Sequence, residues 1–389
     1  MQVRTTSRSL GEDFRYAWLA GLLMAAATLL IAWLEDLPIR DPDSLIPGYI
    51  RFPAIVLGAI SVDIVPRALW RARRAPRTLW TVTREITRDR WPASHWRFAL
   101  GGVMAWYLCY ATFRNLKSFV PFVHAEGDPL SATDNVYDTQ MANLDKVLWL
   151  GHDPAKVLHD LLGTGFAAEL FSAVYIIWIV LVPVSIAIAL VWTRHTAAGS
   201  WYVTAVAFDW ALGAAIYLLF PSVGPIYSDP ETFAGLPETY VSKLQESMWD
   251  DRLAVVGDYV GSGTLQTIAA FASLHVGIMV TICLIVEYVG LARWIRVTSW
   301  VFLVLTVFAT VYLGWHFFVD AIAGAVLGAG TVWLAAMATG NRVGLRPRLR
   351  RVEAREASLV AQAAPADHLS EGQDQAPHSP TGGAAGGRP

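Results

Sequence analysis

The sequence predicts an all-α protein, a polytopic membrane helical bundle with about eight transmembrane helices. Three observations support this fold class. The 389 residues are 54% hydrophobic and 16% charged, with a mean hydropathy of +0.41, which is too apolar for an ordinary soluble domain. Apolar runs recur that approach the roughly 20 residues a helix needs to cross the hydrocarbon core. Seventeen tryptophans suit the boundary between lipid headgroups and hydrocarbon.

The predicted spans can be justified in chain order. The first follows several arginines, is long for a secretory signal core and has no small-residue cleavage pattern behind it, so we interpret it as an uncleaved span. The second is the weakest, because Asp63 and Pro66 interrupt it, and a re-entrant or interfacial segment is the alternative. The predicted spans are Ala17–Leu34, Phe52–Trp70, Phe98–Phe113, Phe171–Trp192, Trp201–Phe220, Leu265–Val286, Val297–Leu313 and Phe317–Met337.

The uneven placement of arginine predicts an orientation. Arginines cluster between the second and third spans, recur in the alternate connections that follow, and accumulate again after the last span. The opposite connections are acidic or nearly neutral. Because cytoplasmic loops retain Lys and Arg, we expect both termini to be cytoplasmic. The preference for arginine over lysine is typical of a high-GC genome, and we therefore expect a bacterial plasma membrane.

The last span begins with a histidine and an aspartate four residues apart, His316 and Asp320. If the helix starts near His316, the two share one face. Asp320 can then accept a hydrogen bond from one ring nitrogen, which fixes the tautomer and makes the other nitrogen a better nucleophile or base. A helix-start histidine with a capping aspartate is the structural alternative. Ionisable groups are costly in lipid, which favours a functional role.

A second histidine, His275, lies just inside the sixth span in the sequence Ser273-Leu274-His275. The loop assignment puts it on the same outer side as His316. Two histidines at one membrane depth suit a two-step transfer, in which one attacks phosphorus and the other protonates the departing alkoxide. Ser273 can donate to a phosphate oxygen. An interfacial histidine without catalytic function is the alternative.

Two cations stand at the outer end of the third span, against the positive-inside trend. Arg114 offers a planar fork for two phosphate oxygens, and Lys117 offers a compact charge on the same helical face. These residue types at this spacing indicate a phosphate site. Snorkelling of both side chains to lipid headgroups is the alternative.

The basic motif, Ser-x-His and His-x-x-x-Asp, in this order and on one side of the membrane, resemble the three signatures of the type 2 phosphatidic acid phosphatase superfamily. The finer resemblance is to its inositol phosphoryl transferase branch, of the aureobasidin-resistance type, which also has Ser-Leu-His, a Tyr-Leu-x-x-His lead-in and a proline-rich segment like Phe220–Pro225. The resemblance covers about 114–328. Ala272 replaces the usual proline, and the phosphatase arginine near Thr310 is absent.

The resemblance implies a six-helix phosphatase-like core and a role for each motif residue. His316 would be the nucleophile, Asp320 its orienting partner and His275 the acid that protonates the leaving group. Phosphate would be held by Arg114, Lys117 and Ser273. No metal or other cofactor is implied. Residues 1–97 would form an N-terminal two-helix extension with a basic cytoplasmic loop, 98–340 the catalytic transmembrane domain, and 341–389 a disordered cytoplasmic tail.

The function these residues indicate is transfer of a phosphoryl-headgroup unit from a phospholipid donor to a lipid or polyprenyl acceptor through a phosphohistidine intermediate. Hydrolysis of a lipid phosphate by the same residues is the close alternative. The partners expected are therefore a phospholipid or polyprenyl phosphate and membrane lipids, with no nucleic acid, and the sequence specifies no oligomeric state. The active site would open on the extracytoplasmic face.

Two other classes of function compete with this interpretation. A carrier could use buried acids to relay protons, but no repeated halves or matched broken helices are found. A metal-dependent hydrolase could use both histidines and Asp320 as ligands. For the intramembrane acids Asp63 and Asp209 we expect structural hydrogen bonds. The polar stretch 143–154 we expect to be an ordered surface loop with an interfacial helix rather than a catalytic segment.

Overall fold

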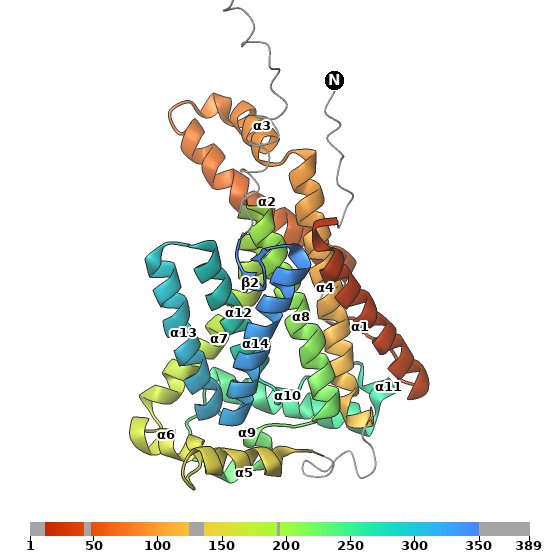
Figure 1. Ribbon diagram of the computed structural model, residues 1–389, viewed down its shortest axis with the longest axis vertical. Coiled ribbons are helices and arrows are strands. Elements are labelled where there is room, and N and C mark those ends of the chain that lie inside the picture. Colours follow the sequence, from red (N-terminus) through yellow and green to blue (C-terminus); the bar gives the residue numbers. More distant parts are fainter. Residues whose placement is uncertain (1–11, 43–47, 124–135, 193–194, 350–389) are drawn as a thin grey trace, which may run out of the picture. The chain divides into compact units, whose positions relative to one another are not determined.

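The computed structural model describes residues 12–42, 48–123, 136–192 and 195–349, and this part of the chain is built almost entirely of helices (Figure 1). Within these ranges, five helices are long and apolar enough to cross a membrane. They are α1 (Arg15–Leu34), α7 (Phe166–Ala187) with its π-helical continuation Ile188–Trp192, α8 (Thr196–Leu219), α13 (Arg293–Tyr312) and α14 (Phe318–Thr339). The prediction of an all-α polytopic bundle is confirmed.

The other three predicted spans are also helical, with shifted bounds: α2 (Gly48–Ala72), α4 (Ala93–Val123) and α12 (Leu274–Val289). We expected the last to begin at Leu265, but Ser273 caps its first turn by accepting a hydrogen bond from the Val276 N–H at 3.4 Å. The preceding residues lie outside the helix. A hydropathy window does not detect a cap, so the predicted start was nine residues too early.

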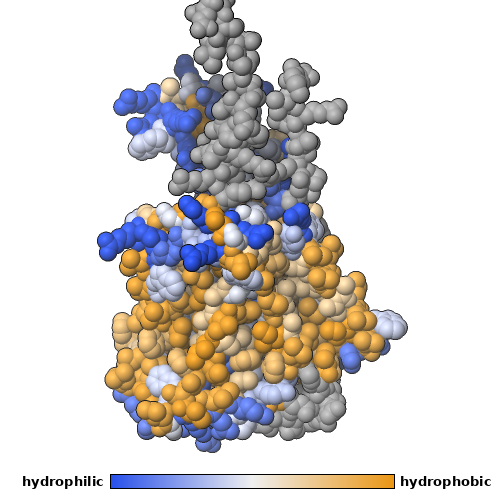
Figure 2. Space-filling model, in the orientation of Figure 1, coloured by the Kyte–Doolittle hydropathy of each residue, from blue (hydrophilic) through white to orange (hydrophobic). Residues whose placement is uncertain are grey.

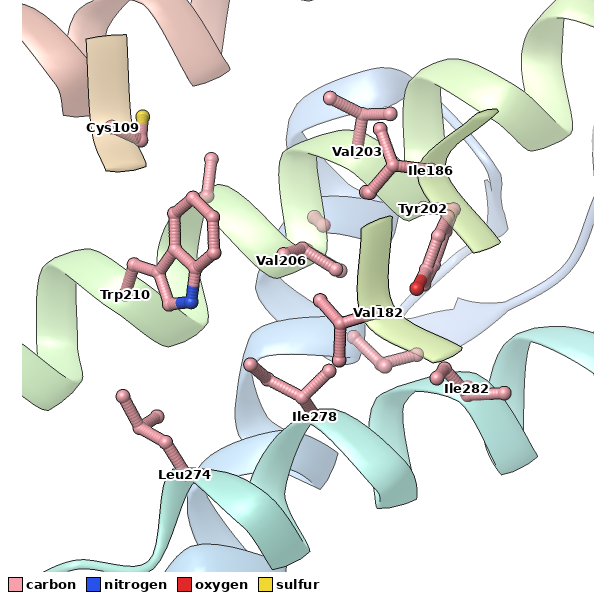
Figure 3. Packing of buried hydrophobic residues seen from close by; sticks show 14 of the residues in the cluster. Cys109, Val182, Ile186, Tyr202, Val203, Val206, Trp210, Leu274, Ile278 and Ile282 are labelled. Carbon is pink, nitrogen blue, oxygen red and sulfur yellow. The ribbon is translucent and has the colours of Figure 1, made fainter. Parts of the chain in front are cut away.

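The centre of the bundle is a layer of apolar side chains where α7, α8 and α12 meet (Figure 3). Leu274, Ile278 and Ile282 form a stripe along α12, each four residues from the next, and so project from one face of the helix. Val182 of α7 and Val206 of α8 belong to the same cluster. Nearly all side chains in this layer are buried, and they hold α12 between its neighbours.

Helices α12 and α14 approach each other backbone to backbone. A Cβ atom added to Gly324 would lie 2.1 Å from the Ser273 carbonyl oxygen, and one on Gly328 would lie 2.1 Å from the Gly277 oxygen. Only glycine fits at these two positions, as at other close crossings of transmembrane helices. This contact fixes how near the start of α12 comes to the start of α14.

The two intramembrane acids are hydrogen-bonded, as expected of structural residues. The Asp209 carboxylate accepts from the Thr281 hydroxyl at 2.8 Å and from the Thr331 hydroxyl at 2.6 Å, which links α8, α12 and α14. Asp63 on α2 pairs with Arg90 at 2.7 Å. Arg90 ends α3 (Leu79–Arg90), which follows the 3₁₀ turn η2 (Pro76–Thr78). Satisfied carboxylates of this kind are tolerated inside a membrane protein.

The short elements gather at the end of the bundle opposite α3 (Figure 1). They are α5 (Asp138–Leu148), α6 (Pro154–Leu162), α9 (Pro225–Ser228), the 3₁₀ turn η4 (Pro230–Phe233), α10 (Tyr240–Gly257) and α11 (Tyr259–Ser262). Another 3₁₀ turn, η1 (Glu12–Phe14), precedes α1. An apolar band separates hydrophilic surface at the two ends in this view (Figure 2).

The first residues of the tail that we predict to be disordered, 341–349, are ordered in the structure. Residues after α14 form a short antiparallel hairpin of β1 (Arg342–Val343) and β2 (Arg346–Pro347). Gly340, with a φ of +73°, ends α14, and Gly344, with a φ of +61°, forms the turn. Strands of two residues give no periodic signal in the sequence. The rest of the predicted tail, 350–389, lies outside the described residues.

Candidate active site

His316 lies in the loop between α13 and α14, not on a helix. Helix α13 ends at Tyr312, and Gly314 reverses the chain with a φ of +74°, where a Cβ would lie 2.8 Å from the Phe233 ring. Helix α14 begins at Phe318, one residue later than the predicted start of this span at Phe317. Glycine at 314 therefore allows the sharp turn that presents the histidine.

Asp320 contacts His316 although the two do not share a helix. One carboxylate oxygen, Oδ2, accepts from the Phe317 backbone N–H at 3.0 Å and lies 3.3 Å from His316 Nδ1. Asp320 is the third residue of α14, so its side chain folds back over the first turn in the manner of a capping box. Both side chains are buried, and the predicted pairing is present in the structure.

The second predicted histidine meets the first directly. His275 Nδ1 lies 2.9 Å from His316 Nε2. An ionised carboxylate only accepts, so Asp320 accepts a hydrogen bond from His316 Nδ1–H, and the proton on Nδ1 leaves a lone pair at Nε2. His275 Nδ1 then donates to that lone pair. Asp320, His316 and His275 thus form one hydrogen-bonded row, and its proton assignment follows from the acceptor at one end.

The two predicted cations are placed differently. Lys117 lies within α4, which continues ten residues beyond the predicted end of this span. Its ammonium is 5.1 Å from the centre of the Tyr217 ring, and its charge acts on both His275 and His316. Arg114, one turn earlier, donates from Nη2 to the Pro42 carbonyl at 3.2 Å. Lys117 is therefore the cation that the structure brings into range of the histidines.

Ser273 is fully buried and holds the start of α12. Its backbone N–H donates to the Asp320 carbonyl at 3.0 Å, and its hydroxyl caps α12. This serine therefore joins the chain segment of one histidine to that of the other. The hydrogen bond that we expect its hydroxyl to donate to a phosphate oxygen stays a prediction.

Aromatic rings surround His275. The Trp178 ring centre lies 4.3 Å from the His275 ring centre, and the Trp178 indole N–H donates to the His275 carbonyl at 3.0 Å. Tyr175 lies 5.0 Å from the same imidazole and stacks on Trp315 with an interplanar angle of 6°. These rings restrict the imidazole to one side, and sequence reasoning did not identify them because aromatic residues are common in transmembrane helices.

Asp145 was missed as a site residue and lies beside the row. Its two carboxylate oxygens accept from the backbone N–H groups of Phe318 at 2.7 Å and Val319 at 2.8 Å, the first two residues of α14. A negative charge at a helix N-terminus is favourable, and here it also fixes the chain next to His316. The sequence predicts an ordered surface loop with an interfacial helix for 143–154, and Asp145 lies on helix α5 in this stretch. The sequence shows an aspartate at 145, but its partner Phe318 lies 173 residues further along the chain.

Asp138 supports the site from the other side. Its carboxylate accepts from the backbone N–H of Val223 at 2.9 Å and of Gly224 at 2.7 Å. These residues belong to the proline-rich segment, and directly after it the Ile226 N–H donates to the Gly314 carbonyl at 2.9 Å. This part of the chain is therefore hydrogen-bonded to the loop of His316. Burial raises the pKa of the Asp138 carboxyl.

Across the described ranges, no group of three or more His, Cys, Asp or Glu side chains is arranged to hold a metal ion. The three residues considered above as metal ligands form the hydrogen-bonded row instead. Both cysteines, Cys109 and Cys283, are buried and unpaired by any disulfide.

Comparison with known proteins gave one match. The model of the PAP2 superfamily matches residues 139–334, which run from α5 into α14 and include Ser273, His275, His316 and Asp320. The basic motif at 114–117 precedes the matched region. No curated protein and no solved structure gave a match. The match spans half of the chain and supports phosphatase or phosphotransferase chemistry on lipid-like substrates, so the chain belongs to the PAP2 superfamily.

Proposed function

We propose that the protein is a membrane phosphotransferase that moves a phosphoryl-headgroup unit from a phospholipid donor to a lipid or polyprenyl acceptor. The observation that carries the proposal is the row in which Asp320 contacts His316 Nδ1 and His275 contacts His316 Nε2. One imidazole in it has a free lone pair, and the other has a proton directed at the same point. These are the two groups that phosphoryl transfer through a histidine requires.

In the first step, the donor phosphate enters between the two rings and takes the place of their mutual hydrogen bond. His316 Nε2 attacks phosphorus, and the bond from phosphorus to the leaving alkoxide breaks. His275, protonated on both ring nitrogens when the phosphate is bound, passes its Nδ1 proton to that alkoxide and becomes neutral, while Asp320 stabilises the charge that develops on His316. Lys117 opposes the negative charge of the phosphate oxygens. The product is a phosphohistidine and a free alcohol.

In the second step, the acceptor hydroxyl attacks phosphorus and gives its proton to His275. The bond between phosphorus and Nε2 breaks, and the row returns to its starting state. A lipid or polyprenyl alcohol as acceptor gives transfer, and water gives hydrolysis. The Ser-Leu-His and Tyr-Leu-x-x-His motifs favour the inositol phosphoryl transferase branch, so we propose transfer, with lipid phosphate hydrolysis as the second candidate.

The proposed orientation puts this chemistry on the extracytoplasmic side of a plasma membrane, with both termini in the cytoplasm. Arginine-rich α3 lies at one end of the bundle, and α5, α6 and α10 lie at the other (Figure 1). Asp145 of α5 contacts Phe318 and Val319, which closely follow His316 in the chain. The positive-inside rule supports the assignment of α3 to the cytoplasm.

The test is turnover of labelled phosphatidylinositol and phosphatidic acid by the purified protein in detergent with chelator. His316→Ala and His275→Ala should each abolish turnover, whereas His152→Ala, an exposed histidine at the same end, should not. The labelled product identifies the acceptor. Release of free phosphate or headgroup phosphate without a lipid product would contradict transfer, and full turnover by His316→Ala would contradict the mechanism.

A further inference from the structure

The loop that carries His316 is held at both ends by one hairpin, α5–α6, residues 138–162. At the far end of the loop, Asp145 binds the first N–H groups of α14. At the near end, His159 Nε2 lies 2.8 Å from the Tyr312 carbonyl oxygen, and the Tyr312 hydroxyl donates to the Gly163 carbonyl at 2.7 Å. The hairpin therefore fixes the position of the nucleophile proposed above.

The same hairpin has an inverted polarity. Its inner face includes the buried polar side chains Asp145 and His159, whereas its outer face exposes large apolar ones. Val147 is 74% exposed, Leu150 90% and Leu161 75%. A hairpin in water would place these groups the other way round. Large exposed apolar surface on an ordered element is typical of a site that contacts lipid or another protein.

Leu150 adds an independent observation. It forms the turn between α5 and α6 with a φ of +56°, the left-handed conformation that favours glycine or asparagine. A leucine there is unfavourable for the backbone, and in water it is also unfavourable for the side chain. The neighbouring Trp149 packs edge-on against Phe318 at 5.3 Å, so the turn is joined directly to the start of α14.

Lipid is the occupant that the surroundings favour. The chain passes from α6 straight into membrane helix α7, whose first residue, Phe166, is 81% exposed and whose outward side chains include Ile177. Figure 2 shows the apolar surface continuing to the lower left, where Figure 1 places α6. Lys146 and Lys156 are exposed on the same hairpin and suit the phosphates of a lipid surface.

We propose that the α5–α6 hairpin inserts its exposed apolar side chains into the lipid leaflet on the active-site side and couples this contact to the position of the His316 loop. The coupling rests on the proposed function, whereas the insertion does not. A substrate in the membrane would then reach His316 while the α5–α6 hairpin, which holds the His316 loop in position, is itself inserted in the lipid.

The insertion is tested with a fluorophore on Leu150→Cys in the full chain, reconstituted into phosphatidylcholine–phosphatidylglycerol vesicles. Cys109 and Cys283 are buried, so the new thiol is the reactive one. Nitroxides on the acyl chains should quench this label strongly. They should quench a label on Lys243→Cys weakly, because Lys243 is 66% exposed in a surface ion pair with Glu238. Equal, weak quenching at both positions overturns the proposal.

A second copy of the chain is the competing occupant. If the label on residue 150 is shielded only at high protein density, and cross-linking through that position gives a dimer, the lipid proposal is wrong. This measurement needs no turnover, so its result is independent of whether His316 is the nucleophile.

The coupling is tested by Leu150→Asn, which keeps a residue that tolerates the left-handed turn. We expect a several-fold fall in the ratio of turnover on vesicle lipid to turnover on a short-chain, water-soluble analogue. Leu150→Met, which keeps an apolar side chain, should lie closer to the parent protein. An unchanged ratio in Leu150→Asn, with the parent active, overturns the coupling but leaves the proposed chemistry standing.

Discussion

At the scale of single residues, the proton arrangement of the site depends on one carboxylate. Asp320 Oδ2 accepts hydrogen bonds from the Phe317 backbone N–H and from His316 Nδ1–H. Because the proton of His316 is on Nδ1, Nε2 has a lone pair. The geometry of the row could survive a substitution that removes only the charge of this carboxylate. Asp320→Asn is such a substitution, since the amide has nearly the same shape as the carboxylate and its oxygen can accept from both the Phe317 N–H and His316 Nδ1.

We predict that Asp320→Asn lowers turnover by roughly 10²- to 10³-fold, because a neutral amide does not stabilise the positive charge that develops on His316 during the attack on phosphorus. Steady-state turnover on the labelled donor measures the loss. The thermal unfolding of the variant in detergent provides the control for folding. Turnover near the parent rate in a folded variant would show that the charge of Asp320 does not matter.

Asp145 gives a prediction for pH. Burial is the largest effect on this carboxyl. It raises the pKa from 3.8 to about 6, although the hydrogen bonds from the Phe318 and Val319 backbone N–H groups act in the opposite direction. A carboxyl with a raised pKa contributes stability below the unfolded value, and that contribution is lost as the pH rises through the folded value. The melting temperature of the parent relative to Asp145→Asn should therefore fall between pH of about 4 and about 6. Differential scanning fluorimetry across this window checks it, and a constant difference would contradict it.

The sequence identified the two histidines and Asp320 but not their supports. Histidine and aspartate near the ends of apolar runs are conspicuous, because few other ionisable groups occur there. Asp145 and Asp138 lie among other acids in a polar loop, and only the fold shows that they reach α14 and the proline-rich segment. A single chain contains no signal for such distant pairings unless a family pattern supplies one.

At the scale of helices, the separation of the two histidines is set by the glycine contact between α12 and α14. A methyl group on Gly328 would meet the Gly277 carbonyl at 2.1 Å, and backbone cannot yield as a side chain can. Pushing the helices apart would lengthen the 2.9 Å contact between His275 and His316.

We predict that Gly328→Ala destabilises the protein by about 1–3 kcal/mol and lowers turnover more than its stability loss explains. Gly330→Ala is the matched control, because nothing lies within 4 Å of a Cβ there and α14 gains a better helix former. Turnover and unfolding in detergent, measured for both variants, separate the two effects. Equal turnover in both would mean that the crossing does not set the histidine distance.

Helix positions were largely predictable and helix ends were not. Each of the eight predicted segments contains a helix, since a long apolar run has few other options in lipid. The start of α12 at Leu274 depends on the Ser273 cap, and the length of α4 depends on residues beyond Phe113 that are polar yet packed inside. Caps and packing of this kind act locally, and average hydropathy does not resolve them.

At the scale of the whole molecule, the two ends of the bundle differ in charge and in chemistry. We predict that a membrane-impermeant maleimide labels Lys243→Cys on α10 in intact cells but labels Arg77→Cys, beside α3, only after the membrane is opened. Arg77 is exposed, and Lys243 is 66% exposed, so access and not burial decides the result. The reverse pattern would place the histidines on the cytoplasmic side.

The supports of the His316 loop also have a consequence for biogenesis. Asp145 and His159 are translated long before their partners Phe318 and Tyr312, because chains are made and inserted from the N-terminus. Until α13 and α14 enter the membrane, the Asp145 carboxylate of the α5–α6 hairpin lacks the backbone N–H groups that it binds in the finished protein. His316, the proposed nucleophile, can be positioned only when the last two helices arrive. Assembly intermediates are therefore expected to be inactive, so a half-inserted chain cannot act on the lipids that surround it.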